Sequence, residues 1–353
     1  AFAANRGPDI FNMDISNEFP YIVNGRVAEV DAKAAGFDST QAIYDAYLPG
    51  VFDPVTYEGG LYGLPLEVTN WSIYLNMDVF RSAGLDPLTD YPKTWEEMMD
   101  VAEKLTLRDG DIITRRGFDF RYPYYLNFVV PMAEQLGGQL ISDDGKSAIV
   151  NDEAWLRVLE YFQQWGPNGK NLGSPTYAAA RKLFNYNNND IGMMESGQYQ
   201  AERIVFDNPT FLPGEGWMVV PFPQWEDAVA DVAEPYYGHY WLVNAQATSE
   251  KQKAAWTFLG YLADRADEFF ERVAVLQPTQ ELVNSDLFKN SPYSDVFMSD
   301  LAKAKVVYYA EDAPRVQQVL KDAVEAVMLQ GKAPADVLKT MREGVERAIR
   351  GEY

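Results

Sequence analysis

Four polar or aromatic side chains crowd into a stretch of the chain that otherwise has the pattern of a buried strand. Glu67, Thr69, Asn70 and Trp71 lie within residues 59–76, GGLYGLPLEVTNWSIYLN, between glycine turns and an apolar run. A carboxylate, a hydroxyl, an amide and an indole are costly to bury unless partners satisfy their hydrogen bonds. The stretch therefore predicts one wall of a binding site for a polar ligand.

Further polar residues follow predicted strands, and ligands in open α/β sheets bind outside the carboxyl ends of strands. Asp14 comes directly after the first predicted strand, and Glu195, Ser196 and Gly197 stand between a later strand and a helix. Backbone N–H groups at the start of a helix can donate to a ligand oxygen. We therefore add these four residues to the candidate site.

Motifs for catalysis or metal binding are missing from the sequence. Nucleophile-elbow, P-loop, dinucleotide-binding and zinc-protease patterns do not occur, and His239 is the single histidine. With no cysteine, a disulfide, a thiol nucleophile and a cysteine-ligated zinc are excluded. We predict a binding protein without cofactor or metal. A glycosidase remains an alternative, because two carboxylates such as Glu67 and Glu195 suffice for that reaction.

Composition narrows the class of ligand. The 353 residues carry a net charge of −22, which disfavours nucleic acid, anionic lipid and anionic solutes. The length predicts about two domains, and no apolar run approaches a membrane span. Aromatic residues make up 14% of the chain and offer flat faces to neutral rings, although most of them are expected in the core. Neutral or cationic solutes fit this composition.

Capping and turn signals indicate the elements that must hold the polar side chains. Thr94 and Glu97 form a capping box for a helix over 95–105, and Ser249 with Gln252 predicts another helix start. Further expected elements are helices over 121–136, 154–165, 198–206, 315–330 and 334–349, strands over 191–194, 217–220 and 236–244, and a hairpin with strands 139–142 and 147–150.

The segment GLYGLPLEVTNWSIYLNMDVFRSAGL followed by PKTWEEMMDVAEKL resembles the signature region of extracellular solute-binding proteins of ABC importers. It is most similar to their carbohydrate-binding branch, which includes maltose-binding protein, and the resemblance continues to about Gly331. It implies an α/β, two-lobe periplasmic-binding-protein fold of the type II-like class. The lobes would be discontinuous in sequence and joined by hinge strands, with a ligand cleft between them.

The resemblance also implies lobe boundaries. The N-terminal lobe is expected to contain residues 1–106 and 246–302, and the C-terminal lobe residues 107–245 and 303–353. A βα unit normally precedes the first strand in this family, and we expect that it has been lost from the N-terminus together with the export signal. The protein would be periplasmic or extracellular, either free or held by a lipid on the missing segment.

Several further site residues come from the resemblance alone. Tyr122-Pro123-Tyr124 resembles a Glu-Pro-Tyr motif of the family, with Tyr122 in place of the carboxylate. The remaining implied residues are Tyr199 at the position of a sugar-stacking tryptophan, and Tyr237, Gly238 and His239 on a cleft strand. Arg315 is a further candidate, because it is expected near a helix start in the second lobe. Core packing for Tyr199, a structural role for His239 and a surface ion pair for Arg315 remain open alternatives.

The expected function is capture of a sugar or sugar-like polyol by hinge closure and its delivery to the permease subunits of an ABC transporter. We expect a monomer that binds no nucleic acid. A second hypothesis is a binding protein for a cationic solute such as a polyamine, which the acidic and aromatic composition would suit.

Overall fold

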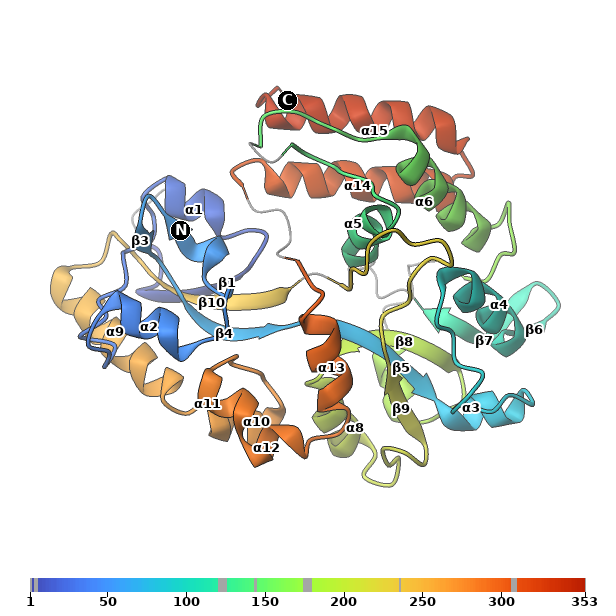
Figure 1. Cartoon of the computed structure of the whole chain (residues 1–353), viewed down its shortest axis with the longest axis horizontal. Coiled ribbons are helices and arrows are strands. Elements are labelled where there is room, and N and C mark those ends of the chain that lie inside the picture. The colour runs from blue at the N-terminus through green and yellow to red at the C-terminus, as the bar shows by residue number, and fades with distance from the viewer. Residues whose placement is uncertain are drawn as a thin grey trace. The chain divides into compact units, whose positions relative to one another are not determined.

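The structure, a computed structural model, describes residues 2, 6–119, 126–142, 145–173, 180–234, 236–305 and 310–352. The chain forms two compact units, each built from separate stretches of sequence (Figure 1). Unit 1 contains Ala1–Asn70, Tyr236–Asp295 and Val306–Pro314, and unit 2 contains Trp71–Pro235, Val296–Lys305 and Arg315–Tyr353. Among the described residues, no helix is long and apolar enough to span a membrane.

Unit 1 is built on a three-stranded antiparallel sheet in the order β1-β10-β4. These strands are β1 (Ile10–Asp14), β10 (Tyr237–Val243) and β4 (Leu64–Thr69). The unit also contains α1 (Phe19–Val23), α2 (Thr40–Ala46), the 3-10 helix η2 (Asp53–Val55), the hairpin β2 (Thr56–Tyr57) and β3 (Gly60–Leu61), α9 (Ser249–Ala263), α10 (Ala266–Val273), α11 (Gln280–Asn284) and α12 (Asp286–Lys289). Its apolar core joins the sheet to α2 and α9, with Ile43, Val68, Leu242, Trp256 and Leu259 all buried.

Unit 2 contains a five-stranded sheet in the order β6-β7-β8-β5-β9. The strands are β6 (Leu107–Asp109), β7 (Ile112–Asp119), β8 (Ile191–Gly197), β5 (Trp71–Asn76) and β9 (Trp217–Val220). β7 and β8 are parallel, and the other pairs are antiparallel. The parallel pair gives the sheet one end at which two strands finish together.

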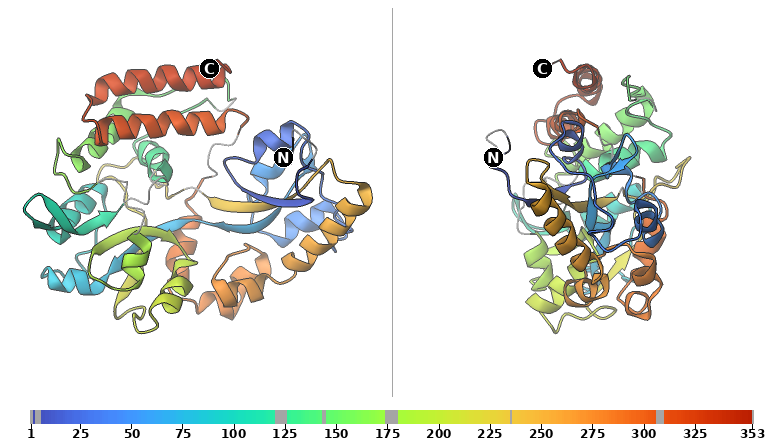
Figure 2. Two further views of the ribbon diagram at one scale, coloured as in Figure 1. Left: turned by 180° about the vertical axis from the view of Figure 1, so that it is seen from behind. Right: turned by 90° about the vertical axis from the view of Figure 1, so that its left-hand side faces the viewer.

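Helices surround the sheet of unit 2. They are α3 (Met77–Ser82), α4 (Trp95–Leu105), α5 (Leu126–Gln135), α6 (Asp152–Trp165), α7 (Ala180–Asn185), α8 (Gln200–Asp207), α13 (Ser294–Leu301), α14 (Ala313–Met328) and α15 (Pro334–Ile349). The long helices α14 and α15 lie side by side in both views of Figure 2. They pack closely because Gly344 of α15 lies against Val319 of α14, where a Cβ would be 2.8 Å from a methyl carbon.

The chain passes between the two units at other residues than the resemblance implied. The expected boundaries lay between residues 106 and 107 and between residues 245 and 246. Since β5 pairs with β8 and β9, the chain from Trp71 onward belongs to unit 2. β10 pairs with β1 and β4, so the chain from Tyr236 onward belongs to unit 1. The sequence motifs mark the strands themselves but do not show which strands pair.

Local signals predicted several helices and turns well. The capping box at α4 is confirmed: the Thr94 hydroxyl accepts from the Glu97 N–H at 3.1 Å, and the Glu97 carboxylate accepts from the Thr94 N–H at 3.3 Å. The predicted hairpin is present as a short bridge between Ile141 and Ala148. The helix start at Ser249 was wrong by one residue, because the Thr248 hydroxyl caps α9 by accepting from the Lys251 N–H.

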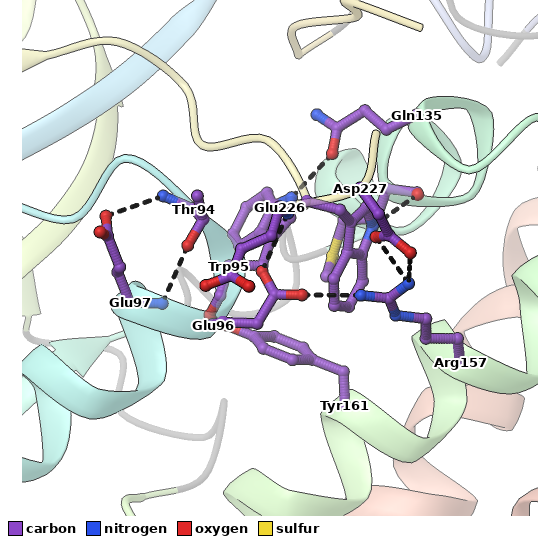
Figure 3. Close-up of polar contacts among 11 residues, drawn as sticks. Thr94, Trp95, Glu96, Glu97, Gln135, Arg157, Tyr161, Glu226 and Asp227 are labelled. Atoms are coloured by element: carbon purple, nitrogen blue, oxygen red, sulfur yellow. Dashed lines mark hydrogen bonds and ion pairs between the residues drawn. The ribbon is translucent and has the colours of Figure 1, made fainter. Parts of the chain in front are cut away.

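A polar network joins three helices of unit 2 to the chain after β9 (Figure 3). The buried amide of Gln135 on α5 accepts from the Trp95 indole N–H at 2.9 Å and donates to the Pro223 carbonyl at 3.0 Å. Nearer the surface, Arg157 on α6 pairs at 2.7 Å with Glu96 and with Asp227. The network joins α4, α5 and α6 to one another and to the chain after β9.

Candidate binding site

Unit 1 has a pocket of about 530 Å³ beside β1 and β10. Its polar lining includes Asn12, Asp14, Asn17, Tyr21 and His239. Pockets that hold small molecules in proteins are typically about 300–1,000 Å³ and combine apolar walls with a few polar groups. The pocket therefore has the size and the mixed lining of a small-molecule site.

Three of the predicted residues lie in a row across the sheet of unit 1. Asp14 on β1 is opposite His239 on β10, and His239 is opposite Glu67 on β4. The His239 Nδ1 and Glu67 Oε1 atoms are 2.8 Å apart, and their side chains are 27% and 13% exposed. The neighbouring pair Thr69 and Tyr237 extends this end of the sheet. The sequence thus named residues that the fold brings together.

The Asp14 carboxylate is held by the turn that follows β1. Its Oδ1 atom accepts from the Ser16 N–H at 3.1 Å and from the Ser16 hydroxyl, and its Oδ2 atom accepts from the Asn17 amide at 2.8 Å. Among the described residues, Asp14 makes no ion pair with a lysine, arginine or histidine. The pocket therefore contains a carboxylate of fixed orientation that has no cationic partner within the described chain.

Glu18, four residues after Asp14, has a different environment. Its side chain is fully buried, and neither carboxylate oxygen has a hydrogen-bond partner in the described part of the chain. Burial, and secondly the nearby charge of Asp14, raise the pKa of Glu18 well above its ordinary value. Glu18 is therefore neutral under conditions in which an ordinary glutamate is ionised.

A second group of predicted residues comes together in unit 2, where β5 begins and β8 ends. Trp71 is opposite Gly197, and Ser196 is opposite Ser72. Trp71, Glu195 and Ser196 are buried, and the Gly197 carbonyl accepts from the Tyr74 hydroxyl at 3.0 Å. These residues lie at the ends of two central strands of the sheet.

Tyr199 follows this group directly and is 6% exposed. The Arg203 guanidinium lies 4.4 Å from the centre of its ring, so one face of the ring is covered by protein. A Cβ on Gly197 would lie 2.6 Å from the same ring, which makes glycine necessary there. Packing onto Gly197 therefore sets the position of Tyr199.

Residues 1–268 match the sequence model of the bacterial extracellular solute-binding protein family. The chain belongs to this family. A Brucella abortus relative named provisionally as a binding protein is 22% identical over 304 residues, which are 83% of this chain and 69% of the relative.

Solved structures of the same fold bind sugars. An ABC transporter solute-binding protein from Thermotoga lettingae, bound to α-D-tagatose, gives a TM-score of 0.83 at 20% identity and covers 99% of this chain and 87% of its own. A maltose/maltodextrin-binding domain from Bdellovibrio bacteriovorus, bound to maltotriose, gives 0.80 at 19% identity, with 99% and 86% covered. These likenesses confirm the predicted two-lobe α/β periplasmic-binding-protein fold.

Family membership settles two broader questions about this solute-binding protein. Its relatives are binding proteins and not enzymes, so the glycosidase alternative with Glu67 and Glu195 is set aside. The family is extracellular, which places the protein in the periplasm or outside the cell.

Some predicted residues of the solute-binding protein lie beyond what the structure describes. Tyr122 and Tyr124 are outside the described residues, as is the side chain of Tyr237, whose backbone is in β10. Arg315 is exposed in the first turn of α14. Their roles stay predictions.

Sequence reasoning missed three of the residues that form the polar lining of the unit 1 pocket, Asn12, Asn17 and Tyr21. Two of them carried usable signals. Asn12 and Asp14 are two apart on one strand and must share a face. The run Asp14-Ile15-Ser16-Asn17 has the residue types of a turn in which side chains bond to nearby backbone. Tyr21 had no such signal, because its place depends on how α1 packs.

Proposed function

We propose that this protein is the solute-binding component of an ABC importer that captures a sugar or sugar-like polyol and delivers it to a membrane permease. The observation that supports this most is the row Asp14, His239 and Glu67 beside a 530 Å³ pocket in a member of an extracellular solute-binding family. The solute would be held by both units, which close around it.

The chemistry of the row suits a sugar. Each sugar hydroxyl both donates and accepts, so it can donate to Asp14 or Glu67 and accept from Asn12 or Asn17. The sugars bound by the Thermotoga lettingae and Bdellovibrio bacteriovorus proteins support this class of ligand. In unit 2, Trp71, Glu195, Ser196, Gly197 and Tyr199 are proposed as the second half of the site.

The energy required is moderate. A micromolar dissociation constant corresponds to about 8 kcal/mol of binding free energy. Shifting two units from mostly open to mostly closed takes about 5.5 kcal/mol of differential affinity for the closed state. Hydrogen bonds to charged groups contribute about 1.5–3 kcal/mol each, so a few contacts from each unit are sufficient.

The test is a ligand panel measured by thermal shift and then by isothermal titration calorimetry. The panel contains D-glucose, maltose, maltotriose, D-tagatose, spermidine and sodium acetate as an anionic control. We expect at least one sugar to raise the Tm and to bind with one site per chain. A panel in which no sugar binds would overturn the proposal.

A polyamine or another cationic solute is the second candidate. It is favoured by the Asp14 carboxylate, which has no cationic partner among the described residues, and by the net charge of −22. Binding of spermidine with no response to any sugar would establish this alternative.

A further inference from the structure

Asp119 is a buried carboxylic acid whose hydrogen bonding is only half complete. It is the last residue of β7 and is 2% exposed. Its Oδ1 atom accepts from the Arg116 guanidinium at 2.5 Å, but its Oδ2 atom has no partner among the described residues. A buried polar atom without a partner costs about 1–3 kcal/mol, and more if it is charged. A ligand that donates to Oδ2 would remove this cost.

The position of Asp119 coincides with the end of the sheet where the unit 2 site is proposed. β7 and β8 are parallel, with Phe118 opposite Met193 and Asp119 opposite Met194. Asp119 is therefore one residue short of the level of Glu195. Ligands in open α/β sheets bind outside the carboxyl ends of such strands.

Two opposing effects set the pKa of Asp119. Burial raises the pKa of Asp119 to about 7, although the Arg116 guanidinium acts in the opposite direction. Within the described part of the chain, Arg116 is the charged side chain that acts on this carboxyl, and the facing residue on β8 is the apolar Met194. The carboxyl therefore changes its protonation in the neutral pH range.

We propose that Asp119 is a ligand-binding residue of unit 2 whose Oδ2 atom accepts a hydrogen bond from a hydroxyl group of the bound sugar. This inference rests on the proposed function. Arg116 is a positioning residue, which holds Oδ1 and leaves Oδ2 for the ligand. A donor on Oδ2 stabilises the ionised carboxylate, so binding of the sugar releases the proton that Asp119 carries at low pH.

The test measures sugar affinity as a function of pH by calorimetry with maltose, maltotriose and D-tagatose. If Asp119 must lose a proton near pH 7 to bind, the affinity is about tenfold higher at pH 8 than at pH 6. At pH 6, repeating the titration in buffers of different ionisation enthalpy should show release of about one proton per bound sugar. Asp119→Asn should weaken binding at pH 8 and remove the dependence on pH.

Two further variants keep the result interpretable. Asp109→Asn makes the same chemical change at an exposed position on β6 and should retain the wild-type profile. Arg116→Gln should move the midpoint of the profile above pH 7, because the cation that opposes protonation is gone. A structural role for Asp119 would lower the Tm of Asp119→Asn but leave affinity and its pH profile as in the wild type.

The outcomes separate the two proposals. Sugar binding that is equally tight and equally pH-dependent in the wild type and in Asp119→Asn overturns the role of Asp119 and leaves the proposed function standing. Absence of binding by any sugar to the wild type overturns the proposed function, and the role of Asp119 with it.

Discussion

At the scale of single residues, hydrogen-bond partners determine how far burial raises the pKa of a carboxyl. Asp300 is buried, yet its Oδ2 atom accepts from the Ser72 hydroxyl and the Phe222 N–H, both at 2.9 Å. Burial raises the pKa of Asp300, and these two hydrogen bonds oppose the rise. Glu18 is buried without such partners among the described residues, so folding strongly disfavours its ionised form.

Glu18→Gln should therefore stabilise the protein at neutral pH. At low pH the Glu18 carboxyl is protonated in both the folded and the unfolded protein, so its ionisation does not reduce the free energy of unfolding. As the pH rises, the unfolded chain ionises first, and the wild type loses stability until the pH passes the raised pKa of Glu18 in the folded state. Since glutamine cannot ionise, the Tm of the variant should exceed that of the wild type by at least about 2 °C at pH 8.

Differential scanning fluorimetry from pH 4 to pH 8 measures this difference. The matched control is Glu29→Gln, which changes an exposed glutamate of the same unit and should leave the Tm within about 1 °C. A Glu18→Gln variant that is less stable than the wild type at pH 8 would show that the carboxylate has a stabilising partner.

The pair His239 and Glu67 carries the next prediction. His239→Ala removes a pocket side chain and leaves Glu67 without the 2.8 Å contact. Because a hydrogen bond to a charged group is worth about 1.5–3 kcal/mol, the dissociation constant for the best sugar of the panel should rise about 10- to 100-fold. Glu250→Gln, an exposed change at the start of α9, is the calorimetric control. Unchanged affinity in His239→Ala would remove the row from the binding site.

Part of the residue row in unit 1 could be predicted from the sequence because strand ends and alternation are local signals. Asp14 and Glu67 were named from residue type and position, whereas His239 came from the family resemblance. The pairing of β1, β10 and β4 brings the three residues together. Glu18 and Asp119 were not named. Their environment is made by burial among distant residues, which residue types alone do not reveal.

At the scale of elements, glycine sets how closely strand and helix approach in unit 2. Gly117 on β7 lies against the backbone of α4, and a Cβ at that position would overlap the Ala102 carbonyl oxygen. The nearest atoms are the backbone O, C and Cα of Ala102, so no side chain can rotate away. Strand and helix would have to separate.

Gly117→Ala should accordingly lower the free energy of unfolding by about 3 kcal/mol or more, at the upper end of the cost of overpacking. Urea unfolding followed by circular dichroism measures the change. Thr114→Ala, at an exposed position of the same strand, should cost less than about 1 kcal/mol. If both variants unfold at the wild-type urea concentration, β7 and α4 are not held as closely as the structure indicates.

The network in Figure 3 allows buried and exposed contacts to be compared directly. Gln135→Leu removes the partner of the Trp95 indole N–H and of the Pro223 carbonyl, and should cost about 2–4 kcal/mol. Arg157→Ala removes ion pairs to the partly exposed Glu96 and Asp227, and should cost less. Urea unfolding in 0.05 M and 1 M NaCl should show a salt-dependent effect for Arg157→Ala alone. Equal costs would contradict this ranking.

Elements were easier to predict than their ends. The capping box fixed α4 over the expected residues because its two hydrogen bonds are encoded within four positions. The start of α9 was displaced by one residue, since Thr248 and Ser249 offer the same hydroxyl chemistry. Packing of Trp256 and Leu259 in the unit 1 core then favours one register of the helix.

At the scale of the whole molecule, the family resemblance implied two lobes that are discontinuous in sequence, but it placed the passages of the chain between them at other residues than the structure does. The passage from Asn70 to Trp71 falls inside the motif that carries the family resemblance. Glu67, Thr69 and Asn70 belong to unit 1, whereas Trp71 belongs to unit 2. A single short motif therefore contributes residues to both units.

Closure gives the last prediction. If the sugar binds both units, saturating sugar should lower the radius of gyration measured by small-angle X-ray scattering. Glu195→Gln would weaken the unit 2 half of the site, so the same sugar should bind less tightly and shift the population toward the closed state less. Asp14→Asn should have the corresponding effect from unit 1. Tight sugar binding with an unchanged radius of gyration in the wild type would mean that one unit holds the solute alone, and the closure mechanism would be abandoned.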